Sequence, residues 1–265
     1  MKHLIIFTLS LIFLNGFSQE GIKVDYKYKD SNQNTNCSLI VIKNEAIFKF
    51  YDGRESGIQD NADGSVAFVT NDDLSKFYFV NERQVFNRHI FLSYEILSVD
   101  DYKDKVKWEI NYKSRKKIGV YNCIEAKTFL NGRNYIAWFT LDVPIKIGPM
   151  KFQNLPGLVV EVLESNGYFT LILQKIAKVT KPKNFDFYKN YFLKTKTNVY
   201  SYNNYEKKVI ETVIANRIRT IESVKKENLN GGRMKVDEGI SNKSAVDMFV
   251  DIPSRLLTEL KKYRF

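Results

Sequence analysis

Residues 148–174 read GPMKFQNLPGLVVEVLESNGYFTLILQ, and the interpretation of the whole chain starts from them. Residues 158–163 are apolar and rich in β-branched side chains, which favours a short strand covered on both faces. Asn166-Gly167 is a signal for a tight hairpin turn, and residues 168–174 return as the partner strand. The stretch therefore predicts a central β-hairpin, which by itself carries no chemistry.

The irregular approach to this hairpin contains Leu155-Pro156-Gly157. Proline fixes φ near the value that the second residue of a type II turn needs, and glycine readily takes the positive φ of the third residue. We therefore expect a type II turn here, with Gly157 at positive φ.

This motif resembles that of the GLPGLI proteins, a family of Bacteroidetes-type bacteria. Here it reads NLPGLV, so Asn154 stands at the first glycine of the motif and Val159 at the final isoleucine. Asparagine adopts the left-handed region more readily than most residues. The similarity covers residues 121–176 and includes Tyr121-Asn122-Cys123, Gly132-Arg133, the AWFT of residues 137–140, Val143-Pro144 and Gly148-Pro149. The resemblance implies an exported protein with no established activity, so it supplies no catalytic residues.

Between residues 21 and 180, short apolar or alternating runs are separated by turn signals such as Asp52-Gly53, Asp63-Gly64 and Asn131-Gly132. Upstream of the central hairpin the expected strands are 22–29, 37–43, 46–51, 66–70, 77–80, 84–88, 91–97, 106–112, 120–130 and 135–141. These patterns predict a mainly β fold: an antiparallel meander of about ten to twelve strands, curled into a barrel or half-barrel.

The N-terminus has the three parts of a secretory signal peptide. Lys2 and His3 are basic, residues 4–14 are apolar but too few to span a bilayer, and small residues precede Gln19. We expect residues 1–18 to be removed on export to the periplasm, the outer membrane or the exterior. The prediction divides the chain into a signal peptide (1–18), a β-sheet domain (19–182) and a helical region (183–265).

Two helices are expected after Lys181-Pro182. The first begins at Asn203 with Glu206 in capping position, and its apolar face holds Val209, Ile210, Val213, Ile214, Ile218, Ile221 and Val224. The second covers residues 251–264, with Leu256, Leu257, Leu260 and Tyr263 on one side. We expect these helices to pack against the sheet or over its open mouth.

The formal net charge is +11. In an exported protein this favours anionic partners such as a lipid surface or an acidic protein, and no nucleic-acid recognition motif accompanies it. A solvated lysine-rich face that keeps the protein soluble explains the charge equally well.

The mature chain has two cysteines, Cys37 and Cys123. An oxidising compartment permits them to pair, and closing so long a loop contributes about 4 kcal/mol in the chain-entropy model. A Cys37–Cys123 disulfide is therefore one of two open possibilities, the other being two free thiols.

Side chains typical of enzymes are scarce. His89 is the single histidine beyond the signal peptide, no CxxC pair exists, and no metal or cofactor site is expected. Glu161 lies in an apolar strand, where burial would raise its pKa, although Arg133 or a lysine is the more ordinary partner.

Three functional classes remain. The favoured one is a non-enzymatic envelope protein that binds a lipid, a peptide or a partner protein. The alternatives are a carboxylate-dependent hydrolase using Glu161 and an outer-membrane β-barrel, which short lysine-bearing strands disfavour. For the binding protein we predict an apolar concavity of the sheet, walled by Leu158, Val160 and Val162 and covered by Ile214 and Ile221.

Overall fold

The structure is a computed structural model that describes residues 20–30, 34–51, 58–60, 66–68, 77–91, 94–130, 133–194 and 199–230. The strands are β1 (Glu20–Asp30), β2 (Asn34–Ile42), β3 (Glu45–Tyr51), β4 (Ile58–Asp60), β5 (Val66–Phe68), β6 (Phe77–Val80), β7 (Gln84–Phe91), β8 (Tyr94–Asp101), β9 (Glu109–Ile118), β10 (Tyr121–Leu130), β11 (Arg133–Thr140), β12 (Leu158–Glu164), β13 (Phe169–Thr180) and β14 (Val199–Ser201). The helices are α1 (Tyr102–Lys105), α2 (Phe185–Lys194) and α3 (Tyr202–Leu229). The predicted signal peptide and the three upstream turn signals lie outside these residues.

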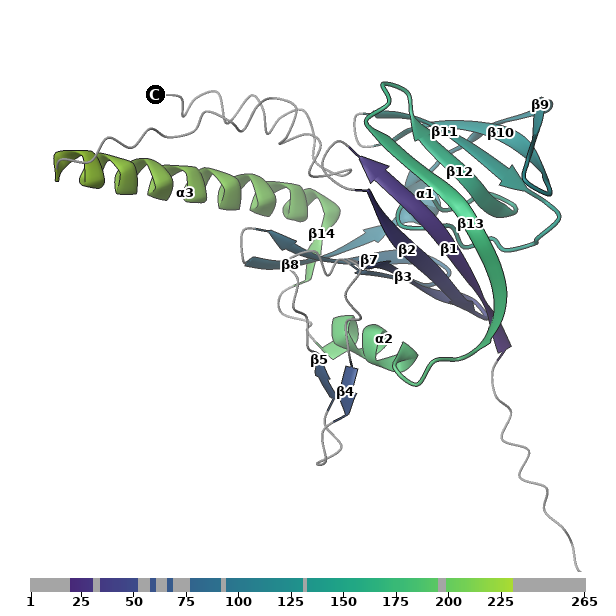
Figure 1. The fold of residues 1–265 in the computed structure, drawn as a ribbon, viewed down its shortest axis with the longest axis horizontal. Helices are drawn as coiled ribbons and strands as arrows, with labels where there is room; N and C mark the ends of the chain where they lie inside the picture. The colour runs from purple at the N-terminus through teal and green to yellow at the C-terminus, as the bar shows by residue number, and fades with distance from the viewer. Residues whose placement is uncertain are drawn as a thin grey trace, which may run out of the picture.

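Twelve of the strands form one open sheet in the order β14-β8-β7-β6-β3-β2-β1-β13-β12-β11-β10-β9 (Figure 1). All neighbours pair antiparallel except β14 and β8, which are parallel. Because β14 and β9 are edges, the sheet is a half-barrel and not a closed barrel. The prediction of a mainly β fold is therefore confirmed.

The sheet consists of two meanders joined by the β1–β13 pair. One runs from β1 through β2, β3, β6 and β7 to β8, and the other runs from β9 to β13. The joining register runs from Glu20 opposite Thr180 to Asp30 opposite Phe169, with a bulge between Asp25 and Tyr26.

The main core lies on one face of the sheet, where inward side chains of both meanders meet the loop between β11 and β12. Tyr28 illustrates the packing, since its ring lies 5.1 Å from that of Phe50 and 5.2 Å from that of Phe169, both edge-on. Fully burying an aromatic side chain of this size contributes about 1.5–3 kcal/mol. These contacts hold the two meanders together.

Helix α2 covers the opposite face of the first meander. The ring of Phe77 lies 4.8 Å from that of Tyr188 and 5.3 Å from that of Phe192. These rings belong to a second hydrophobic cluster between α2 and the sheet. The guanidinium of Arg88 lies over the rings of Phe77 and Tyr191 and makes cation–π contacts with this cluster.

Helix α3 begins at Tyr202, with Ser201 at its N-cap two residues before the expected N-cap Asn203, and no side-chain hydrogen bond caps it. Its main contacts are with β8 and β14, and its C-terminal half extends beyond the sheet (Figure 1). The expectation that this helix lies over the sheet is therefore correct only for its N-terminal part. None of the described helices is long and apolar enough to cross a membrane. The second expected helix, 251–264, lies outside the described residues.

The central hairpin forms as predicted, with Gly167 at φ 78° in its turn. The expected type II turn is wrong, because Gly157 does not have positive φ. A Cβ at Gly157 would instead lie 2.0 Å from the carbonyl oxygen of Thr140, so the glycine permits close approach of two backbones. The left-handed residue is Asn154, at φ 72°.

Candidate functional site

The loop between β11 and β12 is organised by Gln153, which is fully buried. Its Oε1 accepts the N–H of Gly148 at 3.0 Å, and its Nε2 donates to the carbonyl oxygens of Gly148 and Met150, both at 2.7 Å. Its own carbonyl accepts the indole N–H of Trp108 at 2.6 Å. Buried backbone N–H and C=O groups need hydrogen-bond partners, and a loop has no neighbouring strand to supply them. The side chain of Gln153 supplies these partners instead.

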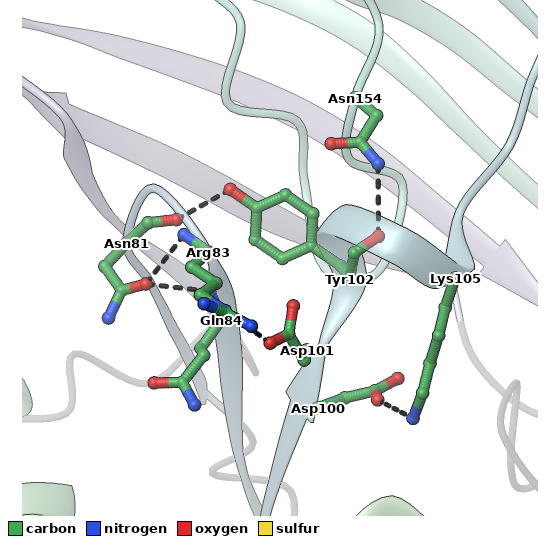
Figure 2. Close-up of polar contacts among 8 residues, drawn as sticks. All are labelled: Asn81, Arg83, Gln84, Asp100, Asp101, Tyr102, Lys105 and Asn154. Carbon is green, nitrogen blue, oxygen red and sulfur yellow. Dashed lines mark hydrogen bonds and ion pairs between the residues drawn. The ribbon is translucent and has the colours of Figure 1, made fainter.

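Asn154 connects this loop to α1. Its Nδ2 donates to the carbonyl oxygen of Tyr102 at 3.1 Å and to that of Val106 at 2.9 Å. Figure 2 shows the side chain above the single turn of α1. The left-handed backbone at Asn154 therefore aims an amide at the two carbonyls that bracket this short helix.

The side chain of Tyr102 connects α1 to the turn between β6 and β7 (Figure 2). Its hydroxyl donates to the carbonyl oxygen of Asn81 at 2.7 Å. The Oδ1 of Asn81 closes the turn by accepting the N–H of Arg83 at 3.0 Å and of Gln84 at 2.7 Å, and Arg83 pairs with Asp101. The loop, α1 and the turn thus form one hydrogen-bonded unit.

Burial, with a smaller contribution from the negative charges of Glu82 and Asp101, raises the pKa of Tyr102 to about 12. The phenol therefore stays protonated at neutral pH and remains a donor to Asn81.

A cavity lies between this unit, the inner face of β6–β8 and the start of α3. Its volume is about 30 Å³, counted as the space that the centre of a water molecule can reach, and it is partly open to solvent. It is lined by Tyr78, Val85, Asn87, Ser98, Asp100, Tyr102, Val106, Leu130, Lys151 and Tyr205. Since a single water centre needs about 10–15 Å³, the space admits one small group.

The polar groups of this cavity are well buried. Asn87 is 7% exposed, and its Oδ1 has no hydrogen-bond partner in the described part of the chain. Ser98 lies opposite Asn87 in the β7–β8 register. Lys151, 9% exposed, donates to the hydroxyl of Tyr135 at 3.1 Å. The cavity therefore offers an unused acceptor beside a buried cation and aromatic walls.

The five residues predicted to bind a ligand line no part of this cavity. Leu158 and Val162 are packed in the main core, and Val160 is buried at a bulge outside it. Ile214 and Ile221 are half-buried on α3, which does not cover β12. The structure does not bring the three β12 residues and the two α3 residues together. Their role in binding stays a prediction.

Glu161, the candidate catalytic carboxylate, lies half-buried on the opposite face and pairs with Lys116. The ammonium of Lys116 also lies 4.3 Å from the ring centre of Trp138. A lysine partner was among the expectations, whereas Arg133 instead lies over the ring of Tyr168. Glu161 is thus part of a surface ion pair and is not among the residues that line the cavity.

Of the two possibilities left open for the cysteines, the structure has the second, because Cys37 and Cys123 are both buried free thiols. Cys37 is in β2 and Cys123 in β10, and four strands of the sheet lie between them. Neighbouring strands are about 4.8 Å apart, so the separation far exceeds the reach of a disulfide. Within the described residues, no three His, Cys, Asp or Glu side chains gather as metal ligands.

The cavity residues were missed in the sequence, although one signal for them exists. Val85 and Asn87 are two residues apart in β7, so their side chains point to the same face of the sheet. Because Val85 points into the core, the polar Asn87 does so as well. A polar side chain at a position that alternation assigns to the core is the pattern that would have found this site.

Comparisons with known proteins give one family model that matches part of the chain. The family model described as "N-glycanase peptide, N-terminal domain" matches residues 75–204, a little under half of the chain. A search of curated proteins found no match.

Similar solved structures include PNGF-II in space group C2, with 14% identity and a TM-score of 0.47 over 69% of this chain and 31% of that one. Another is the complex of Pseudomonas aeruginosa MucA and MucB, with 6% identity and a TM-score of 0.34 over 63% of this chain and 55% of that one. The chain thus spans about a third of the length of PNGF-II and about half of the other chain.

Proposed function

We propose that this protein is an exported binding protein that holds a hydrogen-bond-donating group of its ligand in the cavity beside the motif loop. The Oδ1 of Asn87, which has no hydrogen-bond partner among the described residues, carries the proposal. A buried acceptor without a partner costs about 1–3 kcal/mol, and a donor delivered by a ligand removes that cost. The N–H or O–H of a ligand would therefore be drawn to this point.

The small cavity restricts what can enter it. An acyl chain needs a long apolar space, whereas this cavity takes a single polar group between tyrosine rings. A sugar hydroxyl fits both the size and the acceptor. The match to a family described as an N-glycanase N-terminal domain also supports a glycan ligand. The rest of such a ligand would lie on the surface at the open side of the cavity.

Binding is favoured over hydrolysis by the state of the charged lining groups. The carboxylate of Asp100 is paired with the ammonium of Lys105, and the ammonium of Lys151 donates to Tyr135. Both charged groups therefore interact with neighbouring side chains, and these interactions stabilise the shape of the cavity.

The test is native mass spectrometry of the protein purified from its own cell envelope. We expect an adduct with hexose-type mass increments, and we expect Asn87→Leu to lose it because leucine removes the acceptor and fills the space. Asn134→Leu, the same change at an exposed position of β11, is the matched control and should keep the adduct. A wild-type protein without an adduct, or an adduct retained by Asn87→Leu, would refute the proposal.

A further inference from the structure

Helix α3 has an apolar stripe that the described residues leave partly open. Ile210, Ile214, Ile218, Ile221 and Val224 recur at helical spacing, Ile218 is 36% exposed, and the others are half-buried. The buried anchor of this helix is Tyr205, in its first turn, at 2% exposure. Most helical stability in proteins comes from packing an apolar face, so the distal stripe needs a partner.

The length of the chain beyond α3 suggests which partner this is. The helix has 28 residues and is about 42 Å long. A stretch of 20 residues, 231–250, could span about 66 Å if fully extended, which is enough to return to any point of α3. Residues 251–264 follow this stretch, and the spacing of Leu256, Leu260 and Tyr263 predicts one face of a helix.

We propose that residues 251–264 form a helix that docks on the stripe of α3 over Ile214, Ile218 and Ile221. The tether places this segment at a high effective concentration, which a second copy of the chain lacks. Each of the two helices carries more basic than acidic residues, so apolar contact drives the docking and added salt does not weaken it. The inference is independent of the ligand proposed for the cavity.

Hydrogen exchange on the full-length protein tests this inference. In Leu256→Asp/Leu260→Asp, we expect the amides of residues 214–226 to exchange at least tenfold faster than in the wild type. Ser254→Asp/Thr258→Asp adds the same two negative charges on the opposite helical face, and it should change these rates less than twofold. Amides of β1 and β13 should keep their rates in both variants, which shows that the sheet remains folded.

Three outcomes would overturn the inference. Unchanged exchange of α3 in the Leu256→Asp/Leu260→Asp protein would mean that the segment does not cover the stripe. Wild-type protection that falls on tenfold dilution would assign the stripe to a second copy. Protection that appears only when anionic phosphatidylglycerol vesicles are added, and that salt removes, would assign it to a membrane surface.

Discussion

Replacing Gly157 by alanine tests the close approach that replaces the expected type II turn. The new Cβ would lie 2.0 Å from the carbonyl oxygen and 2.8 Å from the carbonyl carbon of Thr140. Both are backbone atoms beside the β11–β12 pairing, so the strands must separate by more than 1 Å. Forced overpacking of this kind costs about 3 kcal/mol, which for a chain of this size lowers the Tm by about 6–12 °C.

Gly119→Ala is the matched control. Gly119 has φ 58° and its added Cβ meets no atom within 4 Å, so this variant carries only the left-handed cost of about 1 kcal/mol. Urea unfolding of both variants, with the slope m checked for constancy, gives the two free energies. If Gly157→Ala costs no more than Gly119→Ala, the close approach is not what this position requires.

Two further predictions concern the loop and the thiols. Asn154→Ala loses two hydrogen bonds and places alanine at positive φ, so it should cost about 2–4 kcal/mol of unfolding free energy. Asn154→Gly keeps the backbone freedom and should be about 1 kcal/mol more stable than Asn154→Ala in urea titration, and the reverse order would contradict the φ argument. Burial raises the pKa of Cys123 to about 11 and also raises that of Cys37, so native thiols should react with Ellman's reagent at pH 8 only when urea unfolds the chain. Because these folded pKa values are raised, the associated stability is complete below pH 9 and should fall between pH 9 and 11, and a flat profile in this window would refute the shift.

Much of the fold was predictable because local pattern and tertiary environment agree. Strand β6 has the predicted limits of 77–80, and the central hairpin has its predicted turn. Alternation and Asn-Gly signals act over a few residues, and the sheet satisfies them without conflict.

Helix α2 was missed because its sequence, FDFYKNYFLK, is dense in aromatic residues that favour strands as much as helices. Its helical state is decided by packing of Tyr188 and Phe192 on Phe77, more than a hundred positions away in the chain. The role of Gly157 was missed for the same reason, because its neighbour Thr140 belongs to another strand.

The candidate site was the least predictable part. The cavity lining comes from four strands, two helices and two loops, and its decisive atom is an amide oxygen that lacks a partner among the described residues. No short sequence motif predicts that a buried acceptor will lack a hydrogen-bond partner. The motif around Asn154 was recognisable in the sequence. Its structural role, which is to hold α1 beside the cavity by hydrogen bonds from Asn154 to two carbonyl oxygens, depends on contacts that form only in the folded chain.

The position of β1 has a consequence for the order of events in folding. This strand lies between β2 and β13, and its far partner, Thr180, is 160 residues from Glu20 along the chain. A chain that crosses a membrane with its N-terminus first can form the β1–β2–β3 part early, but one flank of β1 stays unpaired until β13 arrives. Pairings over such distances form slowly, because the loop entropy is lost before the contacts are gained. The topology therefore keeps the sheet incomplete until residues 169–180 are available, and until then the open flank of β1 offers unpaired backbone groups to any other strand.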